Sequence, residues 1–286
     1  MLVLNIEDLG ADFFSFWEAA AHVERAAQRA LWQEMYEDCH HEIFDLYYRD
    51  FGERDSLDQA LERFPGEVEA IAERWRRAPD VVRSATRRVT NLLGLVVPEL
   101  RFVIFVGLFS SNAWVSDFRG GPTTFFAVER LPDSPGDEIL IAHECVHQLH
   151  RLLSTDRWDD QRVTHLLFQE GLATAVSEEI VPGRGEAEYL WFEGGFTDWL
   201  AECRRCWPSI RSELVESAEG RAAQSPDRFF SGGGARRYSG ELPERAGYFA
   251  ARMVMREIQG EYPLSEVIGW SANKAELEVR AALNRL

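Results

Sequence analysis

The chain has 286 residues, of which 45% are hydrophobic, so it can bury a sizeable core. Its formal net charge of -17 argues against a nucleic-acid backbone or an anionic membrane surface as partner, because both would repel it at long range. Four cysteines are too few for a disulfide framework in a chain of this size, so we expect free thiols.

The sequence also lacks the patterns of membrane insertion and secretion. No apolar stretch approaches the roughly 18 residues that a membrane span needs. The N-terminus has neither the basic nor the apolar region of a secretory signal. We therefore expect a cytoplasmic protein, and the sequence leaves its oligomeric state open.

Residues 1–95 are predicted to be a helical region of three or four helices. Apolar residues recur at three- and four-residue steps from Phe13 to about Leu93, as on one face of an amphipathic helix. Pro65-Gly66 and Ala78-Pro79 are expected to interrupt these helices. The aromatic residues predicted to pack between them are Trp32, Tyr36, Phe44, Tyr47 and Tyr48.

Strands are expected beyond Val96, where the composition changes. Arg101–Gly107 and Thr123–Glu129 are rich in β-branched and aromatic residues, with turn residues between or beside them. Trp114–Ser116 is a candidate for a third strand. The prediction is an α+β protein that is mainly helical and has a small, mostly antiparallel sheet.

Helical segments follow to the end of the chain. One is predicted from Ser134, which can cap it, to about Leu153, and a second over Val163–Ile180. Further helical segments are predicted over 187–218, 244–258 and 274–286. Residues 232–240 lie in a gap between them and are interpreted as either a lid over a substrate or an ordinary connection.

The segment His143-Glu144-Cys145-Val146-His147 carries the predicted chemistry. Residues four apart on a helix lie about 40° apart around its axis, so His143 and His147 point the same way and can share one metal ion. Glu144 lies about 100° around the axis from His143 and can reach a water on the metal without being a ligand. The pattern predicts a zinc site with Glu144 as general base.

A catalytic zinc site normally has three protein ligands and one position left for water. Glu170 is the preferred third ligand, because Gly171 and Ala173 beside it would let two helices approach closely. The other downstream candidates are His150, His165, Glu178 and Glu179. The metzincin pattern is excluded, since it requires Gly at 150 and His at 153, where this chain has His150 and Leu153.

The motif His143-Glu144-x-x-His147, followed after residues 148–169 by Glu170-Gly171-x-Ala173, resembles the gluzincin arrangement. In that group of zinc peptidases, a glutamate on a following helix is the third zinc ligand. Within the group, the chain is most similar to a bacterial family of predicted zinc-dependent proteases. The resemblance spans about Phe102 to Ile258.

This resemblance implies a zincin-like metallopeptidase domain over residues 96–286. It assigns His143, His147 and Glu170 as the ligands of Zn2+ and Glu144 as the catalytic base. Zinc would polarise the scissile carbonyl and lower the pKa of its bound water toward about 7. Glu144 would take the proton and later return it to the leaving amine.

Two further features are implied by the same resemblance. An edge strand, expected within Gly107–Val115, would hold the substrate backbone by β-pairing. Tyr248, in a Gly-Tyr pair at the start of a late helix, is the first candidate to donate to the oxyanion. Arg245, Tyr238 and His165 compete for that role. The Gly-x-Met-Glu-Asn signature of aminopeptidases is missing, so aminopeptidase activity is not expected.

The predicted function is cleavage of peptide bonds in a peptide or protein substrate. Two alternatives stay open. One is a zinc hydrolase of a non-peptide amide or ester, and the other is a metal-binding regulatory protein with little or no turnover. Retention of Glu144, which chemistry needs and zinc binding does not, counts against the second alternative.

Several other features are interpreted as structural. Cys203 and Cys206 have a redox-like spacing, but no second pair accompanies them. His150 lies one turn beyond His147 and is expected to be solvated. An aromatic run with helical spacing is expected in the core, with some of its members lining a specificity pocket. The run consists of Trp191, Phe192, Phe196 and Trp199.

Overall fold

The structure, a computed structural model, describes residues 2–97, 99–156, 158–220, 226–230 and 242–286. They divide into two compact units. Unit 1 comprises Met1–Ser84 and Val96–Asp133, and unit 2 comprises Ala85–Leu95 and Ser134–Leu286. This division differs from the predicted boundary between residues 95 and 96, because the first strand of the chain pairs with a strand that begins at residue 99.

A four-stranded sheet lies in unit 1. Its strands are β1 (Val3–Asp8), β2 (Glu99–Phe105), β3 (Ala113–Phe118) and β4 (Gly121–Ala127), in the order β1-β2-β4-β3. β2 pairs in parallel with both β1 and β4, and only β3 and β4 are antiparallel. The α+β class is confirmed. The expectation of a mostly antiparallel sheet is wrong, because β2 pairs in parallel with β4 and also with β1, which was not predicted.

The antiparallel pair is a tight hairpin. Arg119 and Gly120 join β3 to β4 with φ of 47° and 86°, and two successive positive φ values are typical of the type I′ turn that suits hairpins. β3 comes last in the strand order, so it is an edge strand of this sheet. It overlaps the Gly107–Val115 range in which an edge strand was expected.

The helices of unit 1 are α1 (Gly10–Ala20), α2 (Arg25–Trp32), α3 (His41–Asp50) and the first part of α4 (Leu57–Leu92), which continues into unit 2. The predicted aromatic packing is confirmed, with Tyr48 half-buried and the others fully buried. α4 continues through Pro65 and Pro79, although interruptions were expected there. Both prolines lie at positions that reach water, which can hydrogen-bond the carbonyl groups they leave unpaired.

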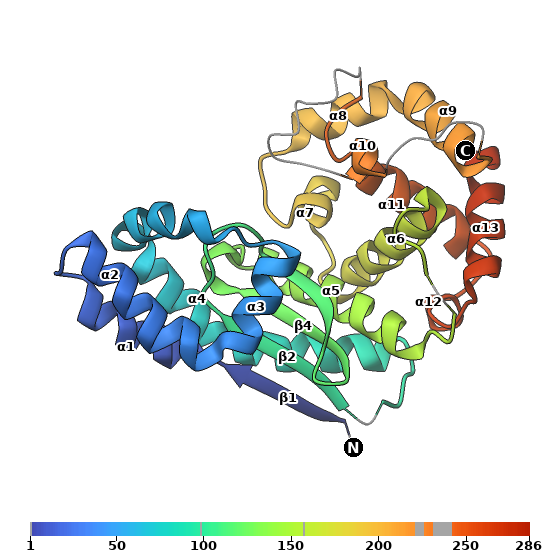
Figure 1. Cartoon of the computed structure of the whole chain (residues 1–286). Coiled ribbons are helices and arrows are strands. Elements are labelled where there is room, and N and C mark those ends of the chain that lie inside the picture. The colour runs from blue at the N-terminus through green and yellow to red at the C-terminus, as the bar shows by residue number, and fades with distance from the viewer. Residues whose placement is uncertain (1, 98, 157, 221–225, 231–241) are drawn as a thin grey trace. The chain divides into compact units, whose positions relative to one another are not determined.

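Unit 2 is helical. Besides the end of α4 it contains α5 (Gly136–Leu153), α6 (Val163–Ile180), α7 (Glu186–Trp191), α8 (Thr197–Arg205), α9 (Trp207–Ala218), α10 (Asp227–Phe230), α11 (Ala246–Gln259), α12 (Leu264–Val267) and α13 (Ala272–Arg285). α6 is central and packs against α5, α11 and α13 (Figure 1). Its bounds are those predicted from the sequence.

Helix α5 carries the His-Glu motif. Ser134 does not cap it, because Pro135 is at the N-cap position and no side chain caps there. The Asp137 carboxylate instead accepts the backbone N–H of Glu138 at 2.9 Å and places negative charge at the positive helix end. Four apolar residues on one face of the helix are buried, namely Ile139, Ala142, Val146 and Leu149. That face anchors α5 and fixes the direction in which the motif residues point.

Among the residues that the structure describes, no helix is both long enough and apolar enough to cross a membrane.

Candidate functional site

Two imidazoles and one carboxylate converge between α5 and α6. The Nε2 atoms of His143 and His147 lie 3.0 Å apart. Glu170 places one carboxylate oxygen 3.0 Å from Nε2 of His143 and the other 3.6 Å from Nε2 of His147. The structure therefore brings together the two histidines of the motif and the glutamate that was preferred as their partner.

These separations can be compared with a zinc site. In a tetrahedral site with ligands about 2.1 Å from the metal, neighbouring ligand atoms lie about 3.4 Å apart. The three separations found here are 3.0, 3.0 and 3.6 Å. Two imidazole nitrogens and a carboxylate oxygen also make a donor set that divalent zinc accepts. The residues present fit a metal of this kind.

The three side chains differ in their exposure to solvent, and the most exposed one marks the side from which a ligand can reach them. The His143 side chain is 3% exposed, that of Glu170 15% and that of His147 20%. Nδ1 of His143 is buried and has no hydrogen-bond partner within the described part of the chain. A ligand would therefore approach from the His147 side.

The carboxylates and imidazoles of this group shift one another's pKa values. Burial alone would raise the pKa of Glu170, but the two imidazoles hold it well below its usual range. Burial would lower the pKa of His147, but the charges of Glu170 and Glu144 raise it to about 9. These side chains thus favour a carboxylate beside a cation, and a metal ion could take the place of the imidazole proton.

Glu144 belongs to the same group. Its potential ligand atom and those of His143 and His147 all lie within 4.8 Å of one another. On that distance alone Glu144 competes with Glu170 as candidate third ligand, but Glu170 lies 3.0 and 3.6 Å from the two imidazole nitrogens and is the better-placed candidate. Burial raises the pKa of Glu144, and the two histidines partly oppose the shift. A raised pKa suits a carboxylate that must accept a proton near neutral pH.

The other ligand candidates face elsewhere. His165 accepts the N–H of Asp159 through Nδ1 at 2.9 Å, and its Nε2 lies 3.8 Å from Glu276. Glu178 pairs with Arg252. His150 was expected to be solvated, and this is wrong. It is buried, and its ring packs edge-on against Trp158 with centroids 4.4 Å apart. Burial lowers its pKa to about 4, so the ring is neutral.

Helix packing positions Glu170. Gly171 faces α11, since a β-carbon there would lie 2.5 Å from the carbonyl oxygen of Ala251. The sequence had indicated that Gly171 permits a close approach, but the structure shows that the approaching helix is α11. Ser177 binds α6 to α5 by donating to the carbonyl oxygen of Ile139 at 3.2 Å. The carboxylate is thus held by a helix that is fixed on two sides.

The candidate oxyanion donor Tyr248 lies at the N-terminal end of α11. Its side chain is half-buried, and its pKa is raised by burial first and then by the charges of Glu170 and Glu144. Of its competitors, Arg245 lies over the Tyr248 ring, with its guanidinium carbon 4.3 Å from the centroid, and Tyr238 lies outside the described residues.

Phe192 is a site residue that the sequence placed only in the aromatic run. Its ring packs edge-on against His143, with centroids 5.3 Å apart. Its backbone has φ of 63° and ends α7 in the left-handed region. That region is strained for a residue with a side chain. Helical spacing in the sequence cannot reveal such a backbone angle.

The cysteines add no chemistry to the group. All four cysteines are free thiols, as expected. Cys145, inside the motif, is buried, and burial raises the pKa of its thiol to about 12. Residues 232–240, interpreted as either a lid or an ordinary connection, lie outside the described residues.

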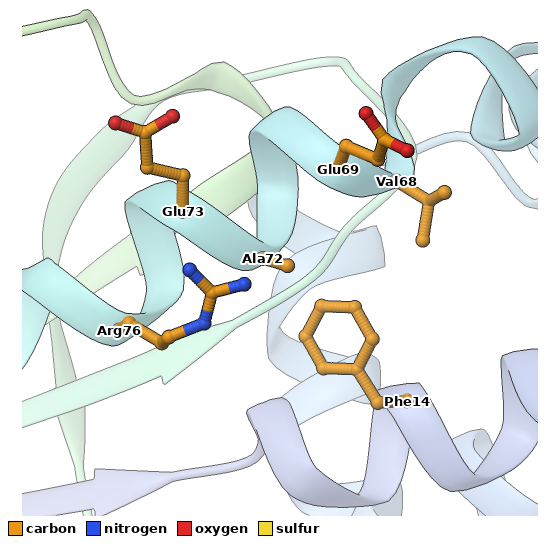
Figure 2. Close-up of a pocket in the computed structure, with 6 residues that line it drawn as sticks. All are labelled: Phe14, Val68, Glu69, Ala72, Glu73 and Arg76. Carbon is orange, nitrogen blue, oxygen red and sulfur yellow. The ribbon is translucent and has the colours of Figure 1, made fainter.

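A separate hollow of about 600 Å³ lies in unit 1 between α1 and α4. Phe14 lies opposite Val68 and Ala72 there (Figure 2), and the remaining lining residues are Glu69, Glu73 and Arg76. None of them belongs to the His143 group. Across the described residues, the only group of three or more metal-ligating side chains is the one in the motif.

Comparison with known proteins gives no relative. No family model matches the chain, and neither a curated protein nor a solved structure is significantly similar to it.

Proposed function

We propose that the chain is a zinc-dependent hydrolase that cleaves peptide bonds, as its gluzincin-like motif implies. The observation that carries the proposal is the convergence of His143, His147 and Glu170, with separations of 3.0, 3.0 and 3.6 Å. An arrangement serving only structure would need one ion pair, whereas two imidazoles that direct Nε2 at one point with a carboxylate are typical of a metal site.

In this proposal, His143, His147 and Glu170 hold zinc. When bound, zinc supplies Lewis acidity, which polarises a carbonyl group and makes water more acidic. The Glu144 carboxylate takes a proton from the attacking water and returns it to the leaving amine. Burial raises its pKa, which makes the carboxylate a stronger base for the first of these transfers. The Tyr248 hydroxyl donates to the oxygen that gains negative charge.

A cleavage assay tests the proposal. Purified protein is incubated with zinc and a mixed peptide library, and products are identified by mass spectrometry. We expect cleavage by the wild type, loss of cleavage with a chelator, recovery on adding zinc back, and no cleavage by Glu144→Gln. Cleavage that survives both the chelator and Glu144→Gln would contradict the proposal. Zinc binding without turnover of any peptide, amide or ester would favour a metal-binding regulatory protein.

A further inference from the structure

Three side chains of unit 2 form a stack beside the candidate metal group, which we call the Arg245 stack. The guanidinium of Arg245 lies over the rings of Trp191 and Tyr248, with its carbon 4.5 and 4.3 Å from their centroids. The stack borders the metal group through Phe192, which follows Trp191 and packs against His143.

Two buried donors in this stack have no acceptor. Nε of Arg245 and Nε1 of Trp191 are both buried and unpaired among the residues that the structure describes. Arg245 donates from Nη2 to the carbonyl oxygen of Leu190 at 2.9 Å. A buried donor without an acceptor is destabilising, and two of them in one stack are uncommon in a folded protein. Acceptors supplied by a ligand would satisfy them.

The backbone at the stack is held in strained conformations. Arg245 has φ of 56° and Phe192 has φ of 63°, both in the left-handed region that side chains disfavour. The bond from Arg245 to Leu190 ties these two segments together. Strained residues kept in place by their surroundings occur most often at binding and catalytic sites, where they fix the positions of side chains before a ligand arrives.

We propose that the Arg245 stack binds a carboxylate of the substrate. A guanidinium offers planar donors that match the two oxygens of a carboxylate, and the indole N–H of Trp191 adds one more. Trp191 also stacks on Phe196, with centroids 4.1 Å apart and planes 2° apart, which gives the subsite an apolar wall. This inference rests on the proposed function and specifies its substrate class, namely peptides with a carboxylate near the scissile bond.

The acidity of the chain makes a local cation necessary for such a substrate. With a net charge of -17, the protein as a whole repels anions, so an anionic group is retained only where a cation faces it at short range. The carboxylate can belong either to the C-terminus of a peptide or to an acidic side chain. Both sources present the same two oxygens to Arg245, and the experiment separates them.

The test uses one cleavable peptide in four forms: C-terminal acid or amide, each with Asp or Asn beside the cleaved bond. The measured quantity is the ratio of kcat/KM between the anionic and the neutral member of each pair. We expect a ratio of about ten or more for the wild type in one of the two pairs, and that pair identifies the source. Arg245→Gln is expected to bring the ratio close to one, and Trp191→Phe to lower it in part.

The matched control is Arg205→Gln, the same chemical change at an exposed arginine of α8 that pairs with Glu202. It is expected to keep the ratio of the wild type. Thermal unfolding of each variant checks that it is folded. A wild-type ratio near one in both pairs overturns the inference whatever the variants do, and so does a preference that survives Arg245→Gln.

Binding separates this inference from the proposed function. Calorimetry with the Glu144→Gln protein and the same four peptides measures affinity without turnover. Tighter binding of an anionic peptide that disappears in Glu144→Gln/Arg245→Gln supports the stack even if the wild type cleaves nothing. In that case only the proposed hydrolysis fails. Equal affinity for all four peptides overturns the stack as a carboxylate subsite.

Discussion

Gly171 lies so close to Ala251 that a β-carbon at residue 171 would be 2.5 Å from the Ala251 carbonyl oxygen. It would also be 3.0 Å from Cβ of Met255. Gly171 directly follows Glu170 on α6, and Ala251 follows Tyr248 by three residues on α11. The contact therefore sets the spacing between the helix with the proposed third ligand and the helix with the candidate oxyanion donor.

Gly171→Ala is expected to destabilise the protein by roughly 1–3 kcal/mol, because the crowded backbones must separate. This outweighs the gain of up to about 1 kcal/mol that alanine brings to a helix. Gly66→Ala is the control. It lies inside α4 with nothing within 4 Å of an added β-carbon, so it should stabilise. Urea unfolding measures both, and effects of the same sign would contradict the close contact.

Arg252 is expected to hold α6, α7 and α11 together. Its side chain is 3% exposed, pairs with Glu178 and lies 3.0 Å from Glu186. Arg252→Met should destabilise by about 3–5 kcal/mol, because two carboxylates lose their buried partner. Arg256 is 50% exposed and approaches the same carboxylates at 3.6 and 3.8 Å. Arg256→Met should therefore change the free energy of unfolding by less than about 1 kcal/mol.

Glu129 in unit 1 should make stability fall as the pH rises. Burial raises its pKa to about 7, although its carboxylate accepts the N–H groups of Gly107 and Phe109 at 2.9 and 3.0 Å. The folded protein then keeps a proton that the unfolded chain releases near pH 4.5. This contribution is complete below that pH and is lost by about pH 7, amounting to roughly 3 kcal/mol.

The measurement is urea unfolding of the wild type and Glu129→Gln between pH 4.5 and 7.5. Other groups titrate in this window, so the difference between the two proteins is the quantity of interest. Glu129→Gln should lose the downward slope that the wild type shows. Parallel stability curves would show that Glu129 titrates normally.

Tyr248→Phe should lower kcat about a hundredfold if the hydroxyl donates to the oxyanion, a loss typical for one such donor. Zinc content should stay at the wild-type level, because Tyr248 is not a proposed ligand. Tyr262→Phe is the control, since that hydroxyl lies 3.4 Å from Glu278 and outside the site. Steady-state kinetics and metal analysis on both variants make the test. A Tyr248→Phe enzyme with unchanged kcat would exclude the role.

The sequence predicts the helices of unit 2 well, because their signal is local. Apolar spacing and the Pro-Gly stop after Ile180 place α6 correctly. β1 was missed because its six residues, Val3–Asp8, gain stability only by pairing with β2, where Val3 faces Glu99. A short strand whose partner is so distant in the chain leaves no local pattern. The parallel pairing of β2 with β4 was missed as well, because composition does not show in which direction two strands pair.

For the candidate site as well, the sequence predicted only the part that depends on local helical spacing. Helical spacing places His143 and His147 on one face, and the helix that follows offers Glu170. Phe192 and Arg245 were not assigned their structural roles, because both depend on left-handed backbone angles at helix ends. Burial of His150 was also missed. Its neighbours Trp158 and Phe168 come from later segments, so nothing adjacent in sequence indicates it.

The most direct test of the account is the metal content of the purified protein. Elemental analysis is made on the wild type, Glu170→Ala and Glu144→Gln after incubation with zinc and removal of excess metal. We predict about one zinc per chain in the wild type and in Glu144→Gln, and a large loss in Glu170→Ala. A folded wild-type protein that retains no divalent metal would contradict the account, because His143, His147 and Glu170 would then be only a buried ion-pair cluster.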